Sequence, residues 1–151
     1  MNILYRQSHI FKVSIIGCLM LFSAVACSAQ EQTATPQKFW SEFRQAVLAK
    51  DNQKLVGMTQ FPLEVRGVDD SQPAKYYKKE QFEAIFRKIL DQPVFTMEGE
   101  KIITNTTNDI IDSTKQITKE HSMTDNSFRV DQLVFEQKDK KWKLVRAYLE
   151  E

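Results

Sequence analysis

Residues 127–151 read SFRVDQLVFEQKDKKWKLVRAYLEE, and this stretch decides the fold. An apolar run at 130–135 and a second at 142–148 flank the charged triplet at 138–140. Two strand-forming runs separated by a short polar turn predict a long antiparallel hairpin. Immediately upstream, residues 115–123, KQITKEHSM, alternate between apolar and polar side chains before a polar turn. The C-terminal part of the chain therefore predicts a three-stranded meander.

Helical patterns precede these strands. We expect Thr35 to cap a first helix and Pro36 to occupy its first position, where the missing N–H costs nothing. Apolar residues then recur at helical spacing over 39–48. A short second helix is expected to restart at Asp51 or Asn52.

A strand and a third helix follow. Residues 61–65 alternate apolar and polar side chains, which predicts a strand. Residues 78–91, KKEQFEAIFRKILD, predict a helix that ends at Gln92-Pro93. Residues 94–113 are rich in β-branched residues yet also allow helical turns, so their structure stays open. Helices first and strands gathered at the end predict an α+β domain, with N-terminal helices on an antiparallel sheet.

Four segments carry a resemblance to a known family. They are FWSEFRQAV at 39–47, QFPLEVRG at 60–67, the pair Phe82 and Phe86, and the apolar pattern of 134–148. With these the chain resembles small exported bacterial proteins of the nuclear-transport-factor-2-like class, relatives of SnoaL and the ketosteroid isomerases. The resemblance implies a cone-shaped domain with a curved antiparallel sheet. It implies no single activity, because that fold hosts enzymes, binding modules and inhibitors alike.

Residues 1–26 are typical of a signal peptide. Arg6 and Lys12 give a positive start, and the 14 residues at 13–26 carry no charge. As a helix these residues would span ~21 Å, which is short of the ~30 Å hydrocarbon core of a membrane. The first 26 residues are therefore expected to be removed, and the mature protein to be exported.

Cys27 follows this leader in the sequence Ala24-Val25-Ala26-Cys27, which resembles the lipobox of bacterial lipoproteins. The two cysteines of the chain are Cys18 and Cys27, so the domain beyond has no disulfide that would use the Cys27 thiol. We therefore expect lipidation of Cys27, with residues 27–34 as a polar tether and 35–151 as a single domain. Plain cleavage after Ala26 or Ala29 is the alternative.

Net charge and the expected lipid anchor indicate which classes of binding partner to expect. The overall net charge is +1, and removal of the positive leader residues Arg6 and Lys12 leaves −1. A balanced surface of this kind does not predict binding to nucleic acid. The lipid anchor predicts a membrane as partner. In a Gram-negative cell, Ser28 in place of aspartate favours the outer membrane, with the domain facing the periplasm.

The side chains offer few combinations for catalysis. His121 is the one histidine beyond the leader, so we expect no metal site and no cofactor. The candidates for lining a ligand pocket are the following: Trp40, Tyr76, Tyr77, His121, Asp131 and Tyr148. Each also has a structural interpretation, as a core, strand or surface residue. No catalytic residue is assigned.

Three functions follow as expectations. The first is a non-catalytic accessory domain of the cell envelope that binds another envelope protein or a small apolar ligand. The second is an inhibitor or immunity-type protein directed at a toxin or an envelope enzyme. The third is an isomerase-like or hydrolase-like enzyme acting on a small molecule.

Overall fold

The structure is a computed structural model that describes residues 34–67 and 73–150. These residues belong to one compact unit of the chain, Gln32–Glu151. The expected signal peptide, the lipidation site Cys27 and most of the tether lie outside the described residues.

The elements alternate between helices and strands and then end in a run of strands. Their order is α1 (Pro36–Leu48), α2 (Asn52–Gly57), β1 (Thr59–Arg66), β2 (Lys75–Tyr77), the 3-10 helix η1 (Lys79–Gln81), α3 (Phe82–Asp91), β3 (Pro93–Glu98), β4 (Lys101–Thr106), α4 (Thr107–Ser113), the 3-10 helix η2 (Lys119–His121), β5 (Ser122–Thr124), β6 (Ser127–Val130), β7 (Leu133–Lys138) and β8 (Lys141–Tyr148).

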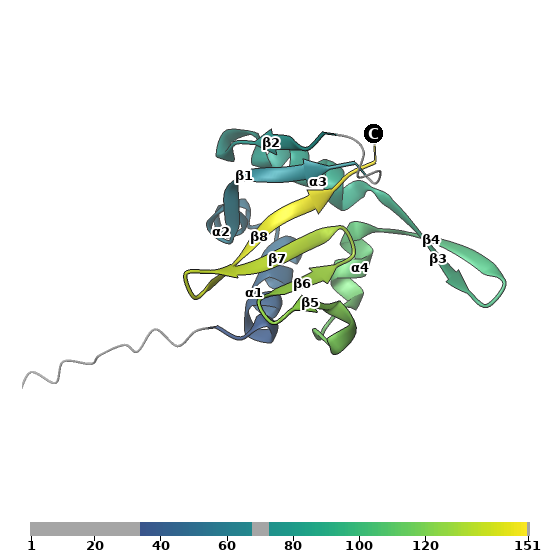
Figure 1. The fold of residues 1–151 in the computed structure, drawn as a ribbon. Helices are drawn as coiled ribbons and strands as arrows, with labels where there is room; N and C mark the ends of the chain where they lie inside the picture. Colours follow the sequence, from purple (N-terminus) through teal and green to yellow (C-terminus); the bar gives the residue numbers. More distant parts are fainter. Residues whose placement is uncertain (1–33, 68–72, 151) are drawn as a thin grey trace, which may run out of the picture. The chain divides into compact units, whose positions relative to one another are not determined.

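Six of the strands form one sheet in the order β2-β1-β8-β7-β6-β5, and β3 and β4 form a separate two-stranded sheet. Helices α1, α3 and α4 lie along one face of the larger sheet, which is curved but does not close into a barrel (Figure 1). The α+β class is confirmed. The expectation of a wholly antiparallel sheet is wrong at one pair, because β1 and β8 run parallel. Parallel neighbours need a long crossover connection, and here the intervening helices and strands supply it.

Local signals explain several element ends. The Thr35 side chain accepts a hydrogen bond from the N–H of Lys38 at 3.2 Å, and Pro36 begins α1, as the sequence predicts. The Asp51 carboxylate caps α2 by accepting from the N–H of Lys54 at 2.9 Å. In the β7–β8 turn, Asp139 and Lys140 have φ values of 48° and 63°, the left-handed pair that a two-residue hairpin turn requires.

The predicted strand at 115–123 is wrong for most of its length. Residues Lys119–His121 form η2, and only Ser122–Thr124 pair as β5. The local reason is that His121 Nδ1 accepts a hydrogen bond from the N–H of Thr118 at 3.1 Å, which closes a helical turn. The alternation in KQITKEHSM thus corresponds to a strand only at its last two residues, Ser122 and Met123.

The segment that the sequence left open, 94–113, contains both kinds of structure. It forms the β3–β4 hairpin and then α4, which begins with a reciprocal cap between Thr106 and Asp109. The N–H and hydroxyl of Thr106 both donate to Asp109 Oδ2 at 2.8 Å. These bonds hold the pKa of the Asp109 carboxyl below its ordinary value, chiefly through the Thr106 hydroxyl.

Aromatic rings fill the space between the helices and the sheet. Phe43 packs edge-on against Phe135 with ring centroids 4.9 Å apart, and Phe128 stacks on Phe135 at 4.7 Å. Trp40 is fully buried beside them, and its indole N–H donates to the carbonyl of Thr114 at 2.7 Å. Aromatic packing therefore occupies the space between the helices and the sheet where Trp40, Phe43, Phe128 and Phe135 meet.

Candidate functional site

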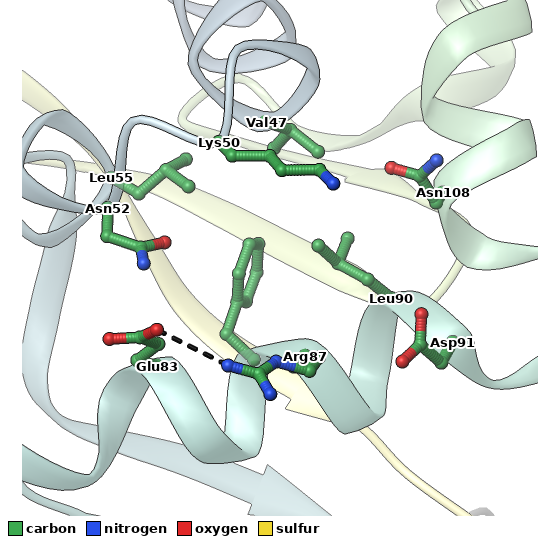
Figure 2. A pocket seen from close by; sticks show the side chains of 10 residues that line it. Val47, Lys50, Asn52, Leu55, Glu83, Arg87, Leu90, Asp91 and Asn108 are labelled. Carbon is green, nitrogen blue, oxygen red and sulfur yellow. Dashed lines mark hydrogen bonds and ion pairs between the residues drawn. The ribbon is translucent and has the colours of Figure 1, made fainter.

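A pocket of about 520 Å³ opens on the helical side of the domain. It lies among the end of α1, helix α2, the length of α3 and the start of α4 (Figure 2). Four apolar side chains form its inner surface: Val47, Leu55, Phe86 and Leu90. Six polar or charged side chains surround its opening: Lys50, Asn52, Glu83, Arg87, Asp91 and Asn108. The size falls within the range of ~300–1,000 Å³ that is usual for small-molecule sites.

The backbone at the end of α1 places Lys50 at the pocket. The N–H of Asp51 donates to the carbonyl of Ala46, and the N–H of Lys50 donates to that of Val47, at 2.9 and 3.0 Å. This is the hydrogen-bond pattern of a Schellman helix end. In that motif the residue after the C-cap adopts a left-handed conformation and is usually glycine. Here it is Lys50, with φ of 55°. A side chain at this position extends across the mouth of the pocket towards Asn108 (Figure 2).

The charges around the opening balance, but they are not all paired. Glu83 and Arg87 form an i,i+4 ion pair at 3.3 Å, with 63% and 69% of their side chains exposed. Within residues 34–67 and 73–150, the ammonium of Lys50 and the carboxylate of Asp91 make no hydrogen bond or ion pair. The pocket thus combines an apolar interior with one unpaired cation and one unpaired anion at its edge.

A second polar cluster lies on the sheet face opposite the helices. Because Leu63, Val65 and Ala147 point into the core, the alternating residues Glu64, Arg66, Arg146 and Tyr148 lie on the other face. Cα pairing aligns Glu64 with Arg146 and Arg66 with Tyr148 across β1 and β8. We call these residues, together with Arg129 of β6, the arginine face.

The Glu64 carboxylate holds this face together. It accepts from Arg66 Nε at 2.5 Å and from Arg146 Nη2 at 3.1 Å. Partial burial raises the pKa of the Glu64 carboxyl, but the hydrogen bonds and charges of Arg146 and Arg66 outweigh it and leave the pKa below its ordinary value. The same contact with Glu64 raises the pKa of Arg146. Arg146 Nε is buried and has no hydrogen-bond partner among the described residues.

Tyr148 connects Arg129 to this cluster. The guanidinium of Arg129 lies 4.6 Å from the centre of the Tyr148 ring, a cation–π contact. Three arginines against one glutamate give the arginine face an excess of positive charge.

None of the six residues predicted to line a pocket lines the one between the helices. Trp40 lies in the core, and Tyr76 is 60% exposed on the edge strand β2, in register with Glu64. Tyr77 packs partly against the core. His121 lies in η2, directly before β5, and β5 is at the opposite edge of the sheet from β2, the strand that carries these tyrosines.

Asp131 and Tyr148 are also separate from the pocket. Asp131 has φ of 48° in the β6–β7 turn, and its Oδ2 accepts a hydrogen bond from the buried Thr107 hydroxyl at 2.8 Å. Tyr148 and Tyr76 are the two predicted residues that share a surface, since both lie on the face of the sheet that carries Glu64.

Lys50 and the arginine face were not predicted as site residues, although features of the chain point to them. Lys50 follows the C-cap Ala49, a position where a Schellman helix end usually has glycine, and its φ of 55° is unfavourable for lysine. The spacing of Glu64 with Arg66, and of Arg146 with Tyr148, has the period of two that puts both members of a pair on one strand face.

In the described part of the chain, no group of three or more His, Cys, Asp or Glu residues is arranged to hold a metal ion. None of the described helices is both long and apolar enough to span a bilayer. Comparison of the chain with protein-family models, with curated proteins and with solved structures gives no match.

Proposed function

We propose that this protein is an exported lipoprotein of the cell envelope, anchored through Cys27, whose domain acts as a non-catalytic binding module. We further propose that the domain is nuclear-transport-factor-2-like. The order of elements supports this, with helices α1 and α2 first and a curved sheet that ends in a run of adjacent strands. In a Gram-negative cell the domain would face the periplasm from the outer membrane.

The observation that carries the binding function is the pocket between α1–α2 and α3. Its apolar interior has room for a small molecule, and its polar side chains all surround the opening, where they contact water. Charges in contact with water are strongly screened, which suits recognition of a polar group better than stabilisation of a transition state. The pocket therefore supports a binding module in preference to an enzyme.

The ligand class follows from the side chains of the pocket. An apolar body would pack on Phe86, Leu55 and Leu90, where burial of each CH₂ contributes ~0.8 kcal/mol. An anionic group would lie beside the unpaired ammonium of Lys50 and point away from the unpaired carboxylate of Asp91, and Asn52 supplies amide donors and acceptors. We therefore propose a small apolar carboxylate or a similar amphiphilic anion as ligand.

Two variants on neighbouring helices test the pocket. Leu90→Trp should fill it, whereas Leu48→Trp adds the same ring to a side chain of α1 that is 40% exposed and does not line it. The probe is anilinonaphthalene sulfonate, an apolar body with one negative charge, titrated by fluorescence and displaced with octanoate. The Leu90→Trp protein should lose most of the displaceable signal and the Leu48→Trp protein should keep it. Equal signals from the two variants would contradict the pocket as the site.

The anchor needs its own experiment. Wild-type protein expressed in a bacterial host should incorporate labelled palmitate and sediment with membranes, and Cys27→Ser should abolish the labelling and release most of the protein from the membranes. Membrane retention of the Cys27→Ser protein equal to that of the wild type would contradict the proposed attachment. Protein isolated with its lipid from its native envelope would then be extracted, and any small molecule it carries identified by mass spectrometry.

The arginine face favours a second function, the recognition of an acidic protein partner, which is the behaviour expected of an inhibitor or immunity-type protein. Its excess of positive charge is the observation that supports it. Complementary charge mainly accelerates association and makes it sensitive to salt. The charge-reversal variant Arg129→Glu should therefore slow binding of such a partner and leave the affinity of the pocket for octanoate unchanged.

A further inference from the structure

The β3–β4 hairpin is a separate two-stranded sheet that projects from the rest of the domain (Figure 1). Its strands pair in regular antiparallel register from Pro93 opposite Thr106 to Glu98 opposite Lys101, and the turn contains Gly99 with φ of 63°. A two-stranded hairpin without a packed face is only marginally stable in water. The regular pairing of this hairpin therefore raises the question of what packs against it.

One face of the hairpin is apolar and exposed. Phe95, Met97 and Ile102 have 67%, 66% and 69% of their side chains exposed, and they are half of the large apolar residues exposed in the described part of the chain. Met97 lies directly opposite Ile102, and Phe95 lies two residues from Met97, so all three share one face. We call this the apolar hairpin face. Apolar side chains that gather in this way mark an interaction surface.

Charged residues are kept off this face. Glu98 lies opposite Lys101 in the register, and both belong to the other side of the hairpin, where opposite charges across two strands stabilise each other. Glu100 lies in the turn at the tip. The apolar face therefore offers a continuous uncharged surface that ends in a charged tip.

The area of this face argues against a second protein as its main partner. Three side chains of this size expose roughly 350 Å² together, whereas a stable protein–protein interface buries about 800 Å² on each partner. A lipid surface has no such minimum when a covalent anchor already holds the protein there, because the anchor supplies a high effective concentration. Between Cys27 and the first helical residue, Pro36, the chain reaches at most ~30 Å, so the anchor keeps the domain close to the bilayer.

We propose that the apolar hairpin face inserts into the interfacial region of the bilayer to which Cys27 anchors the protein. This inference rests on the proposed lipid anchor and adds a second, non-covalent contact to it. Phe95, Met97 and Ile102 enter the boundary between headgroups and acyl chains, and Glu98, Glu100 and Lys101 stay among the headgroups. Two attachment points fix the orientation of the domain relative to the membrane, which one anchor does not.

The test uses a tryptophan reporter in the lipidated full-length protein, reconstituted into vesicles of phosphatidylethanolamine and phosphatidylglycerol. The reporter is Phe95→Trp, and the matched control is Tyr76→Trp, an exposed aromatic residue on β2 away from the hairpin. The native Trp40 and Trp142 are buried and give a constant background. The reporter should emit at shorter wavelength on vesicles and be quenched by lipids with brominated acyl chains, and the control should show neither effect.

Each contrary outcome has a distinct meaning. A reporter that stays water-exposed on vesicle-bound protein would overturn the inserted hairpin and leave the anchor intact. Protein that fails to associate with vesicles at all would overturn the anchor itself. A concentration-dependent shift of the reporter in the Cys27→Ser protein, without vesicles, would show that a second copy covers the face and would overturn the lipid contact.

A second measurement uses substitutions that keep the fold. In the unlipidated Cys27→Ser protein, Met97→Ser should lower the vesicle partition coefficient by about tenfold, the loss that corresponds to one apolar side chain. Met123→Ser, at a similarly exposed methionine on β5, should leave partitioning unchanged. Equal partitioning of the two variants would contradict the assignment of the contact to the hairpin.

Discussion

Replacing Lys50 by glycine is expected to make the domain more stable and its pocket a weaker binder. Lys50, the residue after the C-cap of α1, has φ of 55°, a conformation that costs an L-residue ~1–2 kcal/mol. Glycine relieves this strain. It also increases the conformational entropy of the unfolded chain, which lowers the stability of the folded domain by ~0.5–1 kcal/mol. The net stabilisation is therefore about 0.5–1 kcal/mol, and for a domain of this size the melting temperature should rise by roughly 2–4 °C.

Binding should change in the opposite direction. Lys50→Gly removes the unpaired ammonium at the mouth of the pocket, and an exposed ion pair of this kind contributes ~0.5–1 kcal/mol. The affinity for octanoate should therefore fall by about two- to fivefold, and its dependence on salt concentration should decrease. Thermal unfolding followed by circular dichroism measures the first effect, and displacement of anilinonaphthalene sulfonate measures the second.

Lys140 offers the matched control. It has φ of 63° in the β7–β8 turn and does not line the pocket, so Lys140→Gly should raise the melting temperature similarly without changing the affinity. An unchanged affinity in Lys50→Gly would refute the ammonium as a ligand contact. A melting temperature that rises in Lys140→Gly but not in Lys50→Gly would refute the strain assigned to the end of α1.

Two further predictions concern charges that stabilise the fold. The pKa of Glu64 is lower in the folded protein, so its charged form stabilises the fold above its ordinary pKa of 4.5 and the contribution is lost as the pH falls through the folded value. Glu64→Gln should accordingly cost about 1–2 kcal/mol at neutral pH by removing the charge that Arg66 and Arg146 share. The difference from wild type should shrink in urea titrations below pH 4.5, and a difference independent of pH would contradict the assignment. Arg44→Ala removes the hydrogen-bond donors to the carbonyls at the end of α4 and should lower the free energy of unfolding by about 1–3 kcal/mol. Arg87→Ala removes only an exposed ion pair and should lower it by ~0.5 kcal/mol or less. Equal losses of stability in the two variants would contradict this ranking.

Local signals made much of this fold predictable. Thr35 and Pro36 define the start of α1 because a cap and a fixed φ act within four residues, and the turn at 138–140 needs only two left-handed residues between apolar runs. The parallel pairing of β1 with β8 is different, since it joins segments far apart in the chain. No periodicity within either segment carries that information.

The structure of 94–113, which the sequence left open, and the wrong strand at 115–123 have a related explanation. Period-two patterns report burial of one strand face, and the β3–β4 hairpin buries neither face in the main core. At 115–123 apolar and polar residues alternate without forming a strand over most of the segment. A hydrogen bond from the Thr118 N–H to His121 closes a 3-10 turn there. Where core packing does not select the structure, the hydrophobic pattern loses its predictive value.

The residues proposed to bind ligands also depart from what formation of the fold alone would select. A sequence that only specified a fold would place glycine in the left-handed position that follows the C-cap of α1, and polar residues on an exposed hairpin. This chain places Lys50 in the left-handed position and Phe95 and Met97 on the hairpin. Its aromatic side chains meanwhile fill the interior, where Trp40 is fully buried. Because each of the two departures disfavours the isolated domain and neither is needed to build its core, a contact outside the domain is the physical reason we assign to them: an anion at Lys50 and a lipid surface at the hairpin.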